Sequence, residues 1–127
     1  ILGDFKIIFS VNKKNSNLKI DTDDQYEVIG KNKNCKLLNI SANFYSKIPK
    51  REIFIESDAI SIHANLITNK IVFIKNNKKK LISFKNYNIN KSLQDEHNAI
   101  INKTFKQMCH FNEGYKVMQY IEKIKNK

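Results

Sequence analysis

The chain has 127 residues, of which 41% are hydrophobic, so it is long enough for one domain with a buried core. Its formal net charge is +11, but almost all of the positive charge is scattered Lys, and Arg51 is the only Arg. Base readout and base stacking usually use Arg forks or clustered aromatic side chains, so this composition argues against nucleic-acid binding. No run of about 18 apolar residues occurs, and no membrane-spanning helix is predicted.

The cysteines and histidines do not follow a metal-binding pattern. Cys35 and Cys109 lie far apart without a Cys-x-x-Cys pair, and the three histidines show neither His-x-x-x-His nor His-Glu-x-x-His spacing. We therefore expect no metal site. The cysteine spacing favours a reducing compartment over a disulfide framework, which predicts a cytoplasmic protein.

The first two-thirds of the chain consists of short runs rich in β-branched and aromatic residues, separated by polar turns. Such runs predict strands over residues 5–11, 25–29, 36–45, 51–56, 60–66, 70–74 and 81–84. The run 60–66 alternates apolar and polar residues, so one of its faces is expected to be buried. Because the connections are short, we predict a largely antiparallel meander.

The last third has helical periodicity. The first predicted helix begins at the cap Ser92 and extends through Phe105 to Met108, with acidic residues in its first turns. The second begins at the cap Asn112 and ends in the Lys-rich segment 123–127, where cations favour the helix dipole.

Strands followed by helices predict one α+β domain over residues 1–127. We expect an open, largely antiparallel sheet with the C-terminal helices packed on one face. Those helices cannot cover both faces, and an apolar second face requires a partner. The chain is therefore predicted to form a homo-oligomer through its sheet face.

Four stretches follow one another in an order typical of a known family: Ile1-Leu2-Gly3, Ile20 to Asp24, Asn39 to Ile55, and Cys109 to Met118. Together they resemble the C-terminal domain of the Gfo/Idh/MocA family, the glucose–fructose oxidoreductases, inositol dehydrogenases and relatives. The family counterparts are a Leu-Leu-Gly after the catalytic helix, a D-x-E-D before the second long strand, the S-I-x-L-D-Y-x-x-R-x-P-x-R-x-I-x-I strand pair, and the E-d/e-G start of the last helix.

The resemblance implies that the complete enzyme oxidises or reduces a hydroxyl or carbonyl of a sugar or nucleotide sugar with NAD or NADP. In the family, the Rossmann domain and the catalytic Asp/His lie upstream of the position of Ile1. This chain is therefore expected to hold no catalytic or cofactor-binding residue and to be inactive alone. Its three glycines form no Gly-x-Gly-x-x-Gly fingerprint.

Within the third stretch, the resemblance assigns substrate binding to Asn43, Tyr45, Lys47 and Arg51. The first three alternate on one face of the expected strand, where polar side chains suit sugar hydroxyls or a nucleotide phosphate but equally suit solvent. The planar guanidinium of Arg51 suits a carboxylate or phosphate, and a surface ion pair, for instance with Glu56, is the alternative.

Other polar residues are expected to be structural. His63 is predicted at the surface of the sheet or of a dimer, and the acidic run 21–24 is predicted as a turn before a strand. The neighbours Glu96 and His97 point apart on a helix and receive no catalytic role. Gly114 is expected to permit a close approach at the start of its helix.

A stand-alone basic α+β module is the alternative function. Its Lys-rich loops would bind an acidic protein or a nucleic acid, and the latter predicts an affinity that falls steeply with salt. A reading frame that extends upstream into a strand–GxGxxG–helix pattern favours the oxidoreductase instead.

Overall fold

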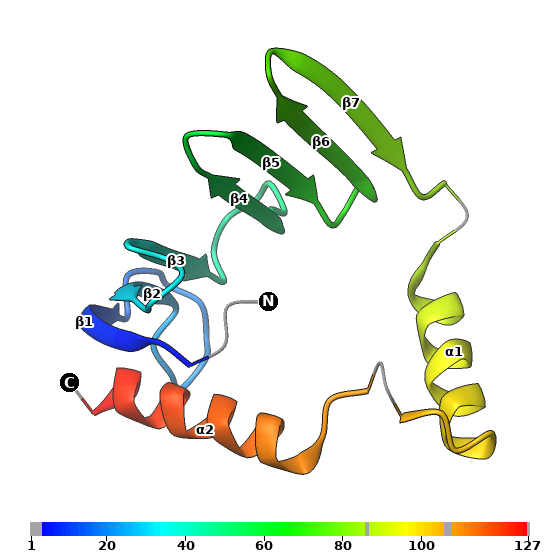
Figure 1. The fold of residues 1–127 in the computed structure, drawn as a ribbon. Helices are drawn as coiled ribbons and strands as arrows, with labels where there is room; N and C mark the ends of the chain where they lie inside the picture. Colours follow the sequence, from blue (N-terminus) through cyan, green and yellow to red (C-terminus); the bar gives the residue numbers. More distant parts are fainter. Residues whose placement is uncertain (1–3, 86, 106–107, 127) are drawn as a thin grey trace. The chain divides into compact units, whose positions relative to one another are not determined.

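The computed structural model describes residues 4–85, 87–105 and 108–126. These residues have the predicted α+β organisation, with antiparallel strands followed by two helices (Figure 1). The elements are β1 (Lys6–Lys13), β2 (Gln25–Lys31), β3 (Leu38–Asn43), β4 (Glu52–Glu56), β5 (Ile60–Asn65), β6 (Lys70–Lys75), β7 (Lys78–Ser83), α1 (Ile89–Ile101) and α2 (Phe111–Lys125).

The strands form two hydrogen-bonded sheets, in the orders β1-β2-β3 and β4-β5-β6-β7. The chain divides accordingly into two compact units, residues 1–47 with 109–127 (unit 1) and residues 48–108 (unit 2). The break between the sheets falls between Asn43 and Glu52, where Pro49 has no N–H to donate to a strand ladder. The single domain over residues 1–127 stays a prediction.

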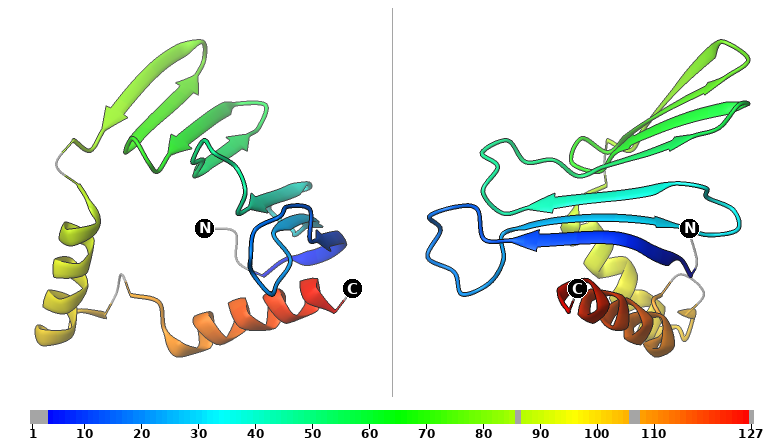
Figure 2. Two further views of the ribbon diagram at one scale, coloured as in Figure 1. Left: turned by 180° about the vertical axis from the view of Figure 1, so that it is seen from behind. Right: turned by 90° about the vertical axis from the view of Figure 1, so that its left-hand side faces the viewer.

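The buried core of unit 1 lies on the central strand β2. Val28 is 2% exposed, and the helix α2 packs against β1 (Figure 1). The ring of Phe5 stacks on that of Tyr120 of α2 with centroids 4.4 Å apart, and the N–H of Phe5 donates to the Tyr120 hydroxyl over 3.0 Å. The predicted packing of a C-terminal helix on a sheet is thus present between α2 and β1. The loop between β1 and β2 projects beyond the strand ends (Figure 2).

Unit 2 is a four-stranded meander with tight turns. Asn76 and Asn77 both have positive φ, 49° and 59°, and join β6 to β7 as the two central residues of a hairpin. Two left-handed residues are typical of a type I′ turn, and Asn tolerates this conformation better than most residues. The predicted strands 70–74 and 81–84 leave residues 75–80 as a polar turn. This was wrong, because the two-residue turn lets Lys78–Lys80 pair as the start of β7.

The helix α1 begins earlier and ends earlier than predicted. Asn88, not Ser92, is its cap, because the extended backbone of Asn88 lets its side-chain oxygen accept the N–H of Lys91 over 3.0 Å. The helix ends at Ile101, so residues 105 and 108 lie outside it.

The helix α2 also begins before its predicted cap Asn112. His110 is the cap, and its N–H donates to the carboxylate of Glu113 over 2.9 Å. Lys123 and Lys125 lie in the last turn, which confirms the predicted basic end. Neither helix, over the residues described, combines the length and apolar character needed to cross a membrane.

The two glycines within described elements have opposite surroundings. A Cβ atom on Gly30 would lie 2.8 Å from Cδ2 of Phe5 and 3.0 Å from the carbonyl oxygen of Lys6. A Cβ on Gly114 would meet its nearest heavy atom, Sγ of Cys109, at 4.0 Å. The close approach predicted for Gly114 was therefore wrong. Gly30 is instead the position where the neighbouring atoms leave no room for a Cβ atom.

We expect Gly30→Ala to lower the free energy of unfolding by about 1–3 kcal/mol, because the methyl group overpacks the Phe5 ring. Gly114→Ala is the matched control and should raise it by up to about 1 kcal/mol, since Ala favours a helix over Gly. Urea titrations followed by circular dichroism measure both. Equal effects of the two substitutions would contradict this packing role of Gly30.

Candidate functional site

The predicted substrate-binding residues divide between the two units. Asn43 is the last residue of β3, and its side-chain oxygen accepts the N–H of Ser46 over 2.9 Å. Tyr45 and Lys47 lie beyond the strand, so the expected alternation of all three along one strand was wrong: the amide of Asn43 turns the chain away from the ladder. Arg51 belongs to unit 2, where its carbonyl oxygen accepts the N–H of Leu66 over 2.8 Å.

Asn43 and Tyr45 nevertheless contribute to one polar surface. The register pairs Gln25 with Asn43 and Glu27 with Ser41, so these side chains lie on the same face of the three-stranded sheet. The Tyr45 hydroxyl reaches this face and donates to Oε1 of Gln25 over 2.8 Å. We refer to these five residues as the Glu27 face.

Glu27 is the centre of a hydrogen-bond network on this face. One of its oxygens, Oε1, accepts the Ser41 hydroxyl over 2.7 Å and the Gln25 amide over 3.4 Å. The amide of Asn15 also donates to Gln25. A carboxylate has about four acceptor positions, so Glu27 retains acceptor capacity for a ligand. The hydroxyls of Ser41 and Tyr45 each donate and accept.

An apolar strip lies beside this network. On β1, Phe9 pairs with Ile29 and Val11 pairs with Glu27, which places both side chains on the same face. Phe9 is 52% exposed and Val11 is 43% exposed. The face thus offers hydrogen-bonding groups on β2 and β3 and an apolar surface on β1. That combination suits a molecule with hydroxyl groups on one side and C–H groups on another.

The loop before β2 is fixed by a buried carboxylate. Asp24 is 0% exposed and accepts the N–H groups of Asn15 over 2.7 Å and of Ser16 over 2.9 Å, together with the Ser16 hydroxyl. The ammonium of Lys14 lies 3.5 Å from the same carboxylate. The acidic run 21–24 is a turn before a strand, as predicted, but the burial of Asp24 was not foreseen.

The same residue positions the Glu27 face through its backbone. The carbonyl oxygen of Asp24 accepts the N–H of Phe44 over 3.0 Å, and its N–H donates to Lys13 over 3.1 Å. Gln25 follows Asp24 directly and Tyr45 follows Phe44 directly. The Asp24 backbone therefore holds the segments that carry the Tyr45–Gln25 hydrogen bond.

Burial alone would raise the pKa of Asp24, but its hydrogen-bond donors outweigh burial. The N–H of Asn15, then the hydroxyl and N–H of Ser16, and finally the charge of Lys14 favour the ionised form, and the pKa falls to about 2. This carboxylate is therefore ionised at neutral pH.

A second polar cluster lies on the four-stranded sheet. His63 stacks on Phe54 with ring centroids 4.2 Å apart, and its Nε2 lies 3.4 Å from Oε1 of Glu52. The same oxygen accepts the Asn65 amide over 2.9 Å. His63 thus occupies a polar position on the sheet, as predicted. Across the described ranges, no three His, Cys, Asp or Glu side chains are grouped so as to hold a metal ion.

Compared with known protein families, with curated proteins and with solved structures, the chain matches none. The resemblance to the Gfo/Idh/MocA family therefore stays a prediction. The geometry of the Glu27 face, with its carboxylate, amides and hydroxyls, is compatible with hydrogen bonds to hydroxyl groups. Side chains alone cannot accept a hydride, so any redox chemistry there requires a cofactor from elsewhere.

We expect the stability of the protein to fall in acid because of Asp24. Its pKa is depressed when folded, so its contribution is complete above about pH 4 and is lost as the pH falls towards 2. Asp24→Asn should lower the melting temperature at pH 7 by several degrees and flatten its dependence between pH 4 and 2. Asp21→Asn, in the same loop but exposed, should do neither. Identical pH profiles for the wild type and Asp24→Asn would contradict this role.

Proposed function

We propose that this chain is the substrate-binding and oligomerisation domain of an NAD(P)-dependent oxidoreductase that acts on a sugar or a nucleotide sugar. The observation that supports the first part is the Glu27 face, whose network combines a carboxylate, amides and hydroxyls beside an apolar strip. A sugar ring has the complementary arrangement, with hydroxyl groups at its edge and C–H groups on its faces.

In this proposal the chain supplies binding and orientation, and the redox step takes place on NAD or NADP. The nucleotide-binding and catalytic residues belong to a Rossmann domain in the full-length protein, and this chain alone is inactive. A cytoplasmic location is part of the same proposal, since nicotinamide cofactors are used inside the cell. The free thiols of Cys35 and Cys109 are compatible with it.

We expect Glu27→Gln to weaken binding of a polyol by about ten-fold or more, because hydrogen bonds to a charged acceptor are worth roughly 1.5–3 kcal/mol. Glucose and myo-inositol are suitable probes, with chemical shifts of the residues of the Glu27 face as the readout. The matched control is Glu56→Gln, which removes an exposed strand carboxylate in unit 2. Tetrahydropyran-2-methanol, which lacks the ring hydroxyls, should bind neither protein measurably.

Two results would count against sugar binding at this face. One is that the polyols leave the resonances of the Glu27 face unmoved in the wild type. The other is that Glu56→Gln weakens binding as much as Glu27→Gln. The alternative, a basic module for an acidic partner, would show binding to polyanions that weakens steeply with salt. An upstream reading frame without a strand–GxGxxG–helix pattern would favour that alternative.

The oligomerisation part of the proposal rests on the four-stranded sheet. Its register places one set of side chains on a single face, which we call the apolar face: Ile53, Ile55, Ile60, Ile62, Ala64, Ile71, Phe73 and Ile82. Among the described residues of 48–108, none is fully buried. A sheet that buries so little needs a cover, and the occupant that we propose is the apolar face of a second copy.

The charges on this face favour a two-fold arrangement. Lys75, Lys78 and Lys80 share the face but lie at one end of it, beside the β6–β7 turn. If the two copies run antiparallel, these lysines lie at opposite rims and do not oppose one another. Ile53 and Ile55 are about 40% exposed and the other members of the face less so, so completing the burial of one such Ile is worth roughly 0.5–1 kcal/mol. Summed over both copies, the free energy gained by this burial is similar to the association cost of about 4–15 kcal/mol. We therefore expect a weak, concentration-dependent dimer.

We expect Ile62→Lys to make the protein monomeric, because it places a charge at the centre of the apolar face. Ser61→Lys is the matched control: it adds the same charge to the same strand on the opposite face and should leave the dimer intact. Sedimentation equilibrium over a range of concentrations gives the dissociation constants, and circular dichroism verifies that both variants fold. A monomeric wild type, or equal loss in both variants, would contradict the proposed interface.

A further inference from the structure

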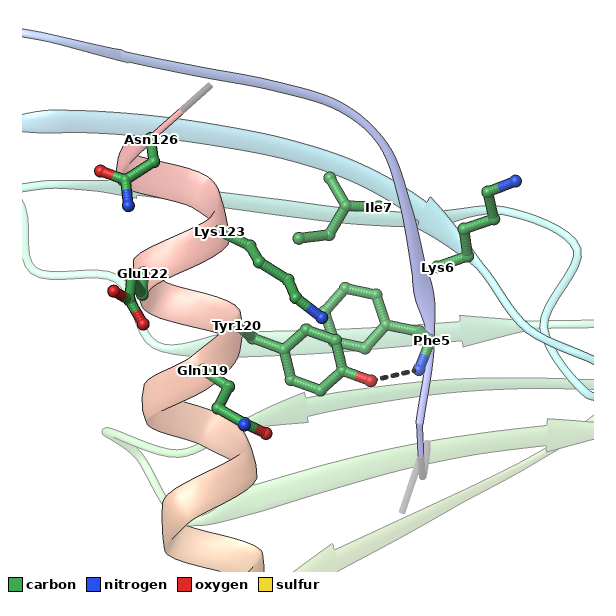
Figure 3. A pocket seen from close by; sticks show the side chains of 8 residues that line it. All are labelled: Phe5, Lys6, Ile7, Gln119, Tyr120, Glu122, Lys123 and Asn126. Atoms are coloured by element: carbon green, nitrogen blue, oxygen red, sulfur yellow. Dashed lines mark hydrogen bonds between the residues drawn. The ribbon is translucent and has the colours of Figure 1, made fainter.

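A cleft lies between the start of β1 and the C-terminal half of α2, away from the Glu27 face and within unit 1. It has a volume of about 730 Å³ and is lined by Phe5, Lys6, Ile7, Gln119, Tyr120, Glu122, Lys123 and Asn126 (Figure 3). Pockets for small molecules have volumes of about 300–1,000 Å³. We call it the Tyr120 cleft.

The aromatic wall of this cleft is held in place before any ligand arrives. The rings of Phe5 and Tyr120 are nearly parallel, with an interplanar angle of 14°, and the hydrogen bond from the Phe5 N–H fixes the Tyr120 hydroxyl. Gly30 lies directly behind Phe5, where any larger residue would displace the ring. A pre-formed wall reduces the conformational entropy that the protein loses when a ligand binds.

Lys123 gives the cleft a positive charge. Its ammonium lies 5.8 Å from the centroid of the Tyr120 ring, and Figure 3 shows it extended towards the ring pair. In the same view Lys6 and Glu122 point away from the rings. Among the ion pairs formed by described side chains, none includes Lys123. The Lys123 ammonium thus lies beside an aromatic wall and forms no ion pair with a described carboxylate. This combination favours an anionic ligand with an apolar body.

We propose that the Tyr120 cleft binds a small organic anion that carries a planar apolar ring. The ring packs against Ile7 and the Phe5–Tyr120 pair, the acid group lies near Lys123, and the amide of Gln119 supplies a further donor. This site is separate from the proposed sugar surface and does not depend on it, since the two involve no common residue.

The test uses 2-naphthoate and its neutral analogue 2-naphthylmethanol, which have the same ring and differ in charge. Ring-current shifts should appear at the Phe5 and Tyr120 resonances with both compounds. We expect 2-naphthoate to bind about three times more tightly, the gain typical of one exposed ion pair. In Lys123→Gln this preference should fall to about one, while the neutral compound binds as before.

Lys125→Gln is the matched control, because it removes the same charge from the same turn of α2 and Lys125 does not line the cleft. It should preserve the preference for 2-naphthoate. An equal loss in both variants would assign the preference to the overall charge of +11 and overturn the proposal. The proposal would also be overturned if 2-naphthoate changed the chemical shifts of other residues but not those of Phe5 and Tyr120.

Discussion

The buried carboxylate of Asp24 is the interaction on which unit 1 most depends. An ionised group without water is costly unless its acceptor positions are filled, and here two backbone N–H groups, a hydroxyl and an ammonium fill them. All four partners come from Lys14 to Ser16, so the loop folds back on the strand that follows it. Asp24 also hydrogen-bonds through its backbone to β1 and to the residue after β3. One residue therefore joins the loop and all three strands.

The sheets of the two units differ in how much of their surface is covered. In unit 1, α2 packs on β1 through the Phe5–Tyr120 pair, and Val28 becomes the buried centre. In unit 2, the strands are joined by short hairpins that satisfy their own backbone hydrogen bonds, yet the apolar face stays partly exposed. Local pairing is enough to define a meander, but burial provides most of the free energy of folding. Unit 2 is the part of the chain whose stability has most to gain from association.

The sequence allowed the strands to be predicted well because alternation is a local property. It did not allow the ends of elements to be predicted, since Asn88 and His110 act as caps through backbone conformations that composition does not reveal. The candidate site was only half predictable. Tyr45 was singled out for a position on a strand that it does not occupy, whereas Glu27 carries no spacing signal and gains its partners when β3 pairs with β2. Asp24 was missed because an acidic run normally stays in solvent.

In the proposed function, Asp24 positions the loop and the strands of unit 1, whereas Glu27 contacts the ligand. Asn15 connects them, because its N–H donates to Asp24 and its amide donates to Gln25 of the Glu27 face. Loss of the Asp24 carboxylate would therefore release the loop and one donor to the polar network together, and both stability and affinity for a hydroxylated ligand would fall. Loss of the Glu27 carboxylate removes a half-buried acceptor whose neighbours keep their own backbone hydrogen bonds. Affinity can then change with little effect on folding, which is how a binding surface differs from the scaffold that holds it.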